Sequence, residues 1–158
     1  MGKISVEKRL KEKKISDIIS PKLNHASPNV SLKAAIDLMQ ERRAGYVVLT
    51  QGKKLVGIFT ETDVLRKVLG QAVDLKRPIS EFMTTTPQVL NPNDPIGKAI
   101  KLISQQRFYH IPLVNDKKEL AGVLSVRTLI RVLAECYPTE VFNMPPDPNQ
   151  VMPTEEGG

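Results

Sequence analysis

Residues 110–125 read HIPLVNDKKELAGVLS. An apolar run at 110–114 is followed by a polar, charged turn and then by a second apolar run at 120–124. Two short apolar runs joined in this way predict a β-hairpin. Residues 127–135, RTLIRVLAE, follow directly and predict a helix, so the hairpin is expected to lead straight into a helical segment.

The same pattern occurs earlier in the chain, which indicates an internal duplication. ISDII at 15–19 returns as ISEFM at 79–83, 64 positions later. The hairpin-forming runs of the first copy lie at 46–50 and 55–59, and they match 110–114 and 120–124 after one residue is inserted in the second turn. Beyond that turn the offset is 65, so that Gly57 corresponds to Gly122 and Thr60 to Ser125.

Each copy also begins with a predicted helix. In the first copy, residues 32–39 carry apolar side chains at the i, i+3, i+4, i+7 spacing of one helix face. In the second copy, Asp94 and Pro95 are expected to supply the N-cap and the first helical residue before Ile96. Residues 62–69 predict the closing helix of the first copy. Each repeat is therefore predicted to run helix, hairpin, helix.

These patterns predict an α/β (α+β) fold made of two repeats. Each repeat is expected to form a small sheet with its helices on one face, and the open sheet faces are expected to pack against each other with pseudo-two-fold symmetry. The predicted organisation is a basic N-terminal segment at 1–14, repeat 1 at 15–70, a linker at 71–78, repeat 2 at 79–136 and a proline-rich, extended tail at 137–158.

Composition limits the class of protein. Apolar residues make up 41% of the 158 residues, which is enough for a core, but aromatic residues are only 4% and Trp is absent, so aliphatic side chains must fill it. The sequence has no apolar run long enough to cross a membrane, no signal-peptide pattern at its N-terminus and one cysteine. These features favour a cytoplasmic protein and no membrane association.

The net charge of +6 fits an anionic partner without choosing one. Part of the excess lies in the N-terminal segment, where lysines and one arginine are interrupted by glutamates. We interpret this segment as a solvated helix face. Nucleic-acid binding through it is the sharper alternative, and the absence of interleaved aromatic residues or a helix-turn-helix pattern argues against it.

The stretch GIFTETD at 57–63 allows two interpretations. Thr60 and Asp63 have the spacing of a capping box, in which the hydroxyl and the carboxylate satisfy free backbone N–H groups at a helix start. The same arrangement suits a nucleotide, because a helix N-terminus attracts phosphate and a carboxylate accepts hydrogen bonds from ribose hydroxyls.

The duplicated order, with RFYHIPLVNDKKELAGVLS at 107–125 and leading segments ISDIIS and ISEFMTTTP, resembles a tandem pair of CBS domains, also called a Bateman module. The resemblance covers about residues 13–135. It implies a regulatory module that binds adenosine nucleotides through a Gly-hydrophobic-x-Thr/Ser-x-x-Asp motif and pairs through its helices into a disc-shaped homodimer. It leaves open whether AMP, ADP, ATP, S-adenosylmethionine or a dinucleotide is preferred.

The resemblance also implies residue roles in a first cavity. Asp63 would hold the ribose, Thr60 the ribose-phosphate region, and Ile58 would lie against the base. Ala44 and Gly45 would offer backbone groups to the adenine edge. The stretch around Lys22–Ala26, which includes His25, would close the other side of the cavity. Tyr109 and His110 of the facing repeat would contact phosphate.

The second copy departs from this motif, because Ser125 is kept but Thr128 replaces the acid. A neutral threonine cannot make charge-assisted bonds to two ribose hydroxyls. A second cavity formed around Val123, Phe108 and Tyr109 with these hydroxyls is therefore expected to bind more weakly or with different selectivity.

The sequence gives no indication of catalysis or of a resident cofactor. It contains no P-loop, no G-x-G-x-x-G and no Cys-x-x-Cys motif, no nucleophile has a visible base, and neither His25 nor His110 has a partner at metal-ligand spacing. We therefore expect a non-enzymatic, adenine-nucleotide-binding regulator of an unknown partner protein. A dimerisation scaffold with a degenerate ligand site is the main alternative.

Overall fold

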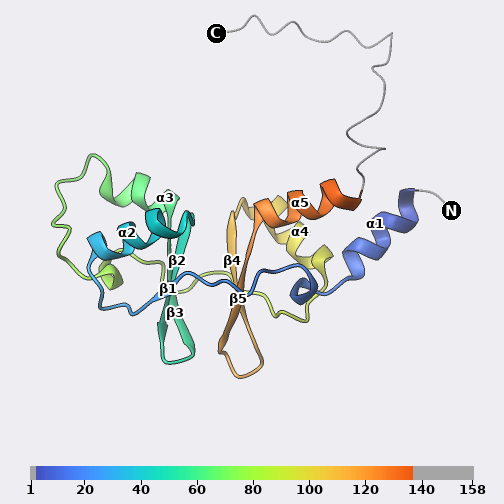
Figure 1. Cartoon of the computed structure of the whole chain (residues 1–158), viewed down its shortest axis with the longest axis horizontal. Helices are drawn as coiled ribbons and strands as arrows, with labels where there is room; N and C mark the ends of the chain where they lie inside the picture. The colour runs from blue at the N-terminus through green and yellow to red at the C-terminus, as the bar shows by residue number, and fades with distance from the viewer. Residues whose placement is uncertain (1–2, 137–158) are drawn as a thin grey trace, which may run out of the picture.

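The computed structural model describes residues 3–136 and places the two repeats side by side, with their hairpins facing each other at the centre (Figure 1). The first part of the chain forms α1 (Lys3–Glu12), a 3-10 turn η1 (Ile15–Asp17), β1 (His25–Ala26), α2 (Leu32–Arg42), β2 (Tyr46–Gln51), β3 (Lys54–Thr60), α3 (Glu61–Asp63) and a π-helical turn η2 (Val64–Val68). The second part forms a 3-10 turn η3 (Ile79–Glu81), α4 (Ile96–Gln106), β4 (His110–Val114), β5 (Leu120–Ser125) and α5 (Val126–Cys136). The predicted tail, 137–158, and residues 1–2 lie outside the described residues.

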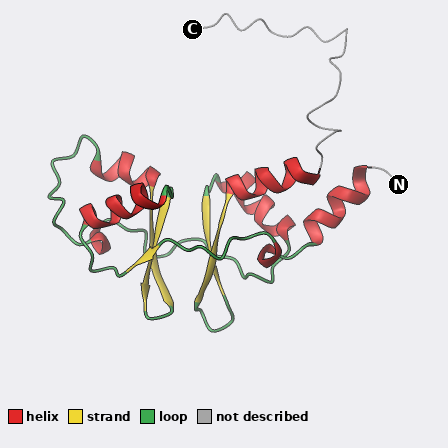
Figure 2. Ribbon diagram, viewed as in Figure 1, coloured by secondary structure: helices red, strands yellow, loops and turns green. Residues whose placement is uncertain are grey.

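Both hairpins are antiparallel. β2 pairs with β3 so that Tyr46 lies opposite Thr60, and β4 pairs with β5 so that His110 lies opposite Ser125. β1 adds a third, parallel strand beside β2. The helices of each half lie on the side of its sheet that faces away from the other half (Figure 2). The predicted α/β architecture with helices on one face of each small sheet is thus confirmed.

The pseudo-two-fold relation is visible at one contact. Tyr46 and His110 occupy corresponding positions in the two repeats, and their ring centroids lie 5.1 Å apart. Residues at equivalent positions meet in this way only where they lie close to the axis that relates the two copies. The axis therefore passes between the first residues of β2 and β4.

The two hydrophobic cores are built from both repeats. The leading segments, defined here as residues 15–24 and 79–88, each cross over to the other half of the molecule. Ile79 and Phe82 are buried in the core of repeat 1, whereas Ile15 is fully buried in the core of repeat 2. Backbone bonds fix each crossing, with the Ile79 N–H donating to Val30 O at 2.8 Å and the Ile15 N–H donating to Asp94 O at 3.0 Å.

The N-terminal helix, like the first leading segment, packs against repeat 2. α1 packs on α4, and Leu10 is only 3% exposed within the core of repeat 2. The Ile96 N–H also donates to Lys13 O at 2.8 Å. The basic N-terminal segment therefore presents charged residues to solvent while one of its apolar residues completes the second core.

The crossing of the second leading segment explains Gly57. A Cβ atom at this position would lie 2.9 Å from the backbone oxygen of Thr84 and 2.5 Å from Met83 Sδ. Thr84 forms a two-way backbone pair with Ile58, at 3.0 and 2.8 Å. The glycine is thus required by the close approach of one repeat's leading segment to the other repeat's strand.

The structure differs from the sequence-based expectation at two helix starts. The predicted helix 62–69 is instead one short α-turn followed by a π-turn, closed by the Leu69 N–H donating to Val64 O at 2.9 Å. At α4 the N-cap is Pro95 in an extended conformation, so Asp94 lies one residue further out than predicted.

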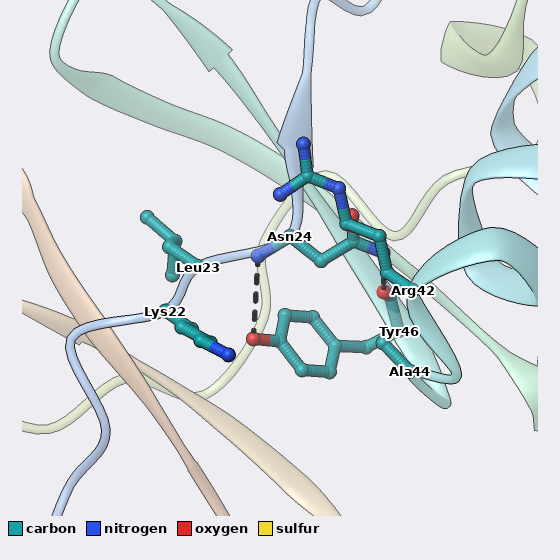
Figure 3. Close-up of a pocket in the computed structure, with 6 residues that line it drawn as sticks. All are labelled: Lys22, Leu23, Asn24, Arg42, Ala44 and Tyr46. Atoms are coloured by element: carbon teal, nitrogen blue, oxygen red, sulfur yellow. Dashed lines mark hydrogen bonds between the residues drawn. The ribbon is translucent and has the colours of Figure 1, made fainter.

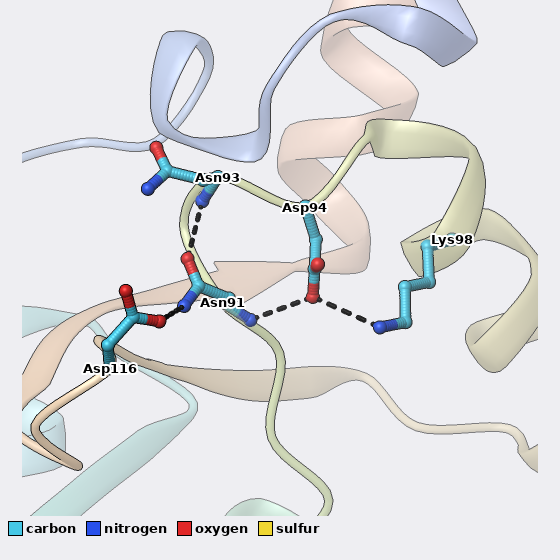
Figure 4. A network of polar contacts seen from close by, with 5 residues as sticks. All are labelled: Asn91, Asn93, Asp94, Lys98 and Asp116. Atoms are coloured by element: carbon cyan, nitrogen blue, oxygen red, sulfur yellow. Dashed lines mark hydrogen bonds and ion pairs between the residues drawn. The ribbon is translucent and has the colours of Figure 1, made fainter.

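Asp94 instead stabilises the preceding loop (Figure 4). Its Oδ2 accepts the Asn91 N–H at 2.9 Å and pairs with Lys98 Nζ at 3.4 Å, and Asn91 Nδ2 donates to Asp116 at 3.0 Å. The loop before α4 is thereby tied to the turn between β4 and β5. Asp94 therefore accepts its hydrogen bond from the loop, and Pro95 occupies the N-cap position of α4.

Candidate functional site

Strand alternation places those predicted site residues that lie on the two hairpins on the faces that the two sheets turn toward each other. Cross-strand partners share a face, so Tyr46 lies beside Thr60, and Val48 lies beside Ile58. The Tyr46–His110 contact shows that this face meets the other hairpin. By the same register, His110, Ser125 and Val123 lie on the opposing face.

A pocket of about 410 Å³ opens beside this junction, between the first leading segment and the start of β2 (Figure 3). It is lined by Lys22, Leu23, Asn24, Arg42, Ala44 and Tyr46. Lys22 and Ala44 were expected at the site. Leu23 and Asn24 fall within the stretch Lys22–Ala26 that was expected to close the cavity, whereas Arg42 and Tyr46 were not expected. The lining comes from two stretches, 22–24 and 42–46, which the fold brings together.

Asn24 and Tyr46 form the polar wall of the pocket. Asn24 Nδ2 donates to Tyr46 O at 2.8 Å, and the Asn24 N–H donates to the Tyr46 hydroxyl at 3.5 Å. Burial raises the pKa of the Tyr46 phenol, and the bond from Asn24 opposes this in part, so the hydroxyl keeps its proton at neutral pH. The phenolic proton is available for a ligand.

Two cations line the pocket without a carboxylate beside them. Lys22 and Arg42 are exposed, and within residues 3–136 neither belongs to an ion pair. Leu23 and Ala44 add apolar surface. The pocket therefore combines positive charge, a phenol and an apolar wall, a combination that suits a flat, anionic ligand.

The Thr60–Asp63 motif forms the capping interaction described above. Asp63 Oδ2 accepts the Thr60 N–H at 2.9 Å and lies 3.3 Å from the Thr60 hydroxyl. Asp63 Oδ1 pairs with Lys67 Nζ at 3.1 Å, and the Asp63 side chain is only 13% exposed. Lys67 also donates to Phe82 O at 2.7 Å. The carboxylate thus serves as a helix cap and joins repeat 1 to the second leading segment.

The corresponding cap in repeat 2 is made by hydroxyl groups alone. Ser125 Oγ lies 3.0 Å from Thr128 Oγ1 and accepts the Thr128 N–H at 3.2 Å. Of the neighbouring residues predicted for a second cavity, Phe108 packs against the core of repeat 2 and Val123 is half-buried. Tyr109 is 60% exposed, and its carbonyl accepts the Val126 N–H at 2.9 Å.

His110 lies at the contact between the two repeats, next to Tyr46 and Gly45. A Cβ on Gly45 would be 3.0 Å from Glu61 Oε2 and 3.1 Å from His110 Cε1, so the carboxylate and the imidazole flank the same point. Burial lowers the pKa of His110, Glu61 opposes that effect, and Arg127 adds to it. His25 is exposed on β1, and neither His25 nor Gly45 lines the 410 Å³ pocket.

A second pocket of about 380 Å³ lies between α2 and the α3–η2 turn. Its lining combines apolar side chains with one cation and one carboxylate: Ile36, Met39, Gln40, Arg43, Ala44, Glu61 and Val64. Ala44 borders both pockets. Among the described residues no group of three or more His, Cys, Asp or Glu side chains is placed to hold a metal ion, and no helix there is long and apolar enough to span a bilayer.

Sequence reasoning missed Arg42 and Tyr46, and it did not single out Asn24. Asn24 lay within the stretch 22–26 that the family resemblance placed at the cavity, but nothing in that stretch marks it out from its polar neighbours Lys22 and His25. Arg42 looked like any exposed residue at the end of a helix. Nothing in its sequence context distinguishes it from Arg43.

Comparisons with known proteins agree with this architecture. The CBS domain profile matches residues 15–70 and 79–135. A 17.7 kDa protein of Acidianus ambivalens, uncharacterised, is 28% identical over 133 residues, covering 84% of this chain and 79% of that protein.

Solved structures show the same fold. A CBS domain protein of Pyrobaculum aerophilum, solved with AMP, superposes with a TM-score of 0.71 at 26% identity, covering 78% of this chain and 98% of that one. A CBS domain pair solved with 5′-methylthioadenosine and S-adenosyl-L-methionine gives a TM-score of 0.70 at 21% identity, over 78% and 97% of the two chains. With two CBS domains matched over most of its length, the chain belongs to the CBS domain family and is a tandem CBS domain pair.

Proposed function

We propose that this protein is a non-enzymatic regulatory module that binds an adenine nucleotide in the 410 Å³ pocket of repeat 1. The observation that carries the proposal is the lining of that pocket, where Lys22 and Arg42 lie without acidic partners beside Tyr46 and Asn24. Cations without partners attract a phosphate group, and the aromatic and apolar side chains offer a surface to a base. The Pyrobaculum relative, which holds AMP, supports the ligand class.

Repeat 2 offers a natural contrast at the same positions. With the offset of 64, Lys22 corresponds to Thr86 and Arg42 to Gln106, so uncharged residues stand in repeat 2 where repeat 1 has cations. The pairing of Ala26 with Leu49 and of Leu90 with Leu113 supports this alignment, because the same register holds in both repeats. A phosphate-bearing ligand should therefore favour the pocket of repeat 1.

The leading segment gives a physical route for a conformational signal. Residues 22–24 line the pocket in repeat 1, while Ile15 of the same segment is buried in the core of repeat 2. A ligand that binds one arrangement of this segment more tightly shifts the relative positions of the two repeats, and a partner protein can read that shift. The identity of the regulated partner is not encoded in the pocket.

Titration calorimetry with AMP, ADP, ATP and GTP tests the proposal. We expect adenine nucleotides to bind with modest affinity and GTP to bind more weakly. Arg42→Ala should weaken AMP binding, whereas Gln106→Ala, the matched change in repeat 2, should leave it unchanged. If no adenine nucleotide gives heat or a thermal shift at millimolar concentration, the scaffold alternative replaces the regulatory one.

A homodimer is the assembly that the surface supports. Leu65 is 65% exposed and its counterpart Ile130 is 59% exposed, on the last helical segment of each repeat. Large apolar side chains exposed at two symmetry-related positions favour a contact between copies. Light scattering at micromolar concentration should give a dimer mass, and Leu65→Glu combined with Ile130→Glu should give a monomer. A wild-type monomer would contradict this assembly.

A further inference from the structure

The turns of the two hairpins form one basic surface that the proposed function does not use. Both turns lie at the end of the molecule away from the helices (Figure 1). Backbone contacts join them, because the Leu120 N–H donates to Lys53 O at 2.8 Å and Lys54 forms an antiparallel β-bridge with Glu119. We define the hairpin-tip surface as the four exposed lysines of these turns: Lys53, Lys54, Lys117 and Lys118.

The lysines of the hairpin-tip surface are not neutralised by ion pairs. Within residues 3–136 none of the four ammonium groups pairs with a carboxylate. The same turns contain two acids, and both accept hydrogen bonds from asparagines. Asp116 Oδ1 accepts Asn91 Nδ2 at 3.0 Å, and Glu119 Oε1 accepts Asn115 Nδ2 at 3.3 Å. The surface therefore keeps an excess of positive charge that can attract an anionic partner.

Lys118 occupies a backbone position that favours glycine. Its φ is +62°, and the residue with positive φ in the turn of the first hairpin is Gly52, at +61°. A side chain is disfavoured in this left-handed region. The second turn is held by Asn115, whose Oδ1 accepts the N–H groups of Lys117 and Glu119 at 3.0 and 2.9 Å. A lysine is present here at a cost to the backbone, which favours a role for its charge.

We propose that the hairpin-tip surface binds an extended acidic segment of a partner protein. Residues 51–54 and 115–119 contain no arginine and no aromatic residue, which are the side chains that grip a phosphate through two bonds or stack on a base. Asp116 and Glu119 also interrupt the cations. A peptide can space its carboxylates to avoid these two acids, whereas a nucleic-acid backbone carries a charge at every phosphate.

The hairpin-tip surface is separate from the nucleotide pocket. Tyr46, which lines the pocket, begins β2, and Gln51 ends this strand of six residues beside the first turn. At about 3.3 Å per residue, the two ends of the strand lie roughly 17 Å apart. An acidic segment can therefore bind the turns while the pocket stays open. The inference goes beyond the proposed nucleotide-binding function and does not depend on it.

Fluorescence anisotropy with a labelled poly-glutamate peptide, measured on the full chain at low salt without nucleotide, tests the proposal. Lys53→Gln combined with Lys117→Gln should weaken peptide binding by about fivefold or more, as expected when two exposed charge pairs are lost. The matched control is Lys8→Gln combined with Lys13→Gln, which removes the same charge from exposed positions of the N-terminal segment. This control should bind within about twofold of wild type.

Lys118→Gly separates the charge of the side chain from the geometry of the turn. The glycine relieves the left-handed backbone, so the melting temperature should rise. The lost cation should weaken binding of the poly-glutamate peptide by about twofold to fivefold. A variant that is more stable but binds less well would show that this lysine serves binding. Unchanged affinity would overturn its part in the surface.

Three further results would overturn the proposal. The first is failure of the wild-type protein to bind the peptide at low salt. The second is an equal loss of affinity in the hairpin-tip and N-terminal double variants, which would mean that the peptide responds only to net charge. The third is a short DNA duplex that binds more tightly than the peptide and is weakened by the same hairpin-tip variants, which would make the surface a nucleic-acid site.

Discussion

The helical segment that follows each hairpin is capped by different side chains in the two repeats. In repeat 1 the cap is the carboxylate of Asp63, which also pairs with Lys67, whereas in repeat 2 two hydroxyls share the cap. With the offset of 65, Lys67 corresponds to Val132, which packs against the core of repeat 2. The acid and its basic partner have therefore been replaced together.

The joint replacement indicates that burying the Asp63 carboxylate costs free energy, and that repeat 1 offsets this cost with a basic partner. A charge that is 13% exposed needs a partner, and Lys67 supplies it while also donating to Phe82 O in the second leading segment. The pocket cations Lys22 and Arg42 show the same asymmetry with their neutral counterparts. At these four positions repeat 1 carries a charged residue and repeat 2 an uncharged one, and repeat 1 is where we propose that the ligand binds.

The largest expected effect compares the two glycines at the repeat crossings. Gly57→Ala should lower the free energy of unfolding by about 2–3 kcal/mol, because the new Cβ meets the Thr84 backbone, which cannot move without breaking its pairing with Ile58. Gly122→Ala should cost about 1 kcal/mol or less, since its Cβ meets only the terminal methyl of Ile19 at 2.8 Å. Denaturant unfolding of both variants measures this, and equal costs would show that the two crossings are equally tight.

The second prediction addresses the ribose role of the acid. If Asp63 accepts a ribose hydroxyl, Asp63→Ala should weaken AMP binding by about 10–100-fold, as expected for loss of a hydrogen bond to a charged group. If Asp63 is only a cap, the variant should lose about 1 kcal/mol of stability and keep its affinity. Thr128→Ala is the control. A larger affinity loss from Thr128→Ala than from Asp63→Ala would move the ribose site to repeat 2.

A double substitution sharpens the comparison by copying repeat 2 into repeat 1. Asp63→Thr combined with Lys67→Val should lie within about 1 kcal/mol of the wild-type free energy of unfolding, because both charges leave together. Lys67→Val alone should be less stable than the double variant, since it leaves Asp63 without its partner. Thermal denaturation of the three proteins gives the order. Additive losses in the double variant would mean that the two residues do not act as a pair.

The smallest expected effect is the pH dependence contributed by His110. Burial holds its pKa below the usual value of 6.5, so the unfolded chain takes up a proton first as the pH falls below that value. The stability contribution is therefore fully present above pH 6.5 and declines as the pH falls further. Melting temperatures of wild type and His110→Gln across this range should converge at low pH.

Part of the site followed from the sequence and part did not. The motif at 57–63 forms the capping box that was one of its two interpretations, and Lys22 and Ala44, which the family resemblance placed at a ligand cavity, border the 410 Å³ pocket. Arg42 and Tyr46 lie close together in the sequence, but Asn24 reaches them only when the first leading segment folds against the start of β2. Their convergence depends on tertiary contacts that no local pattern records.

By itself, the sequence determined the duplication, the two hairpins and helices α2, α4 and α5, because each depends on local periodicity and on the spacing between repeats. Only the tertiary structure decided which core each leading segment enters. Ile15 and Ile79 precede their own repeats in the chain yet are buried in the opposite ones. An apolar residue in a short turn predicts burial, but it does not predict which core will bury it. The hydrophobic effect depends on the apolar area removed from water and is the same for either core.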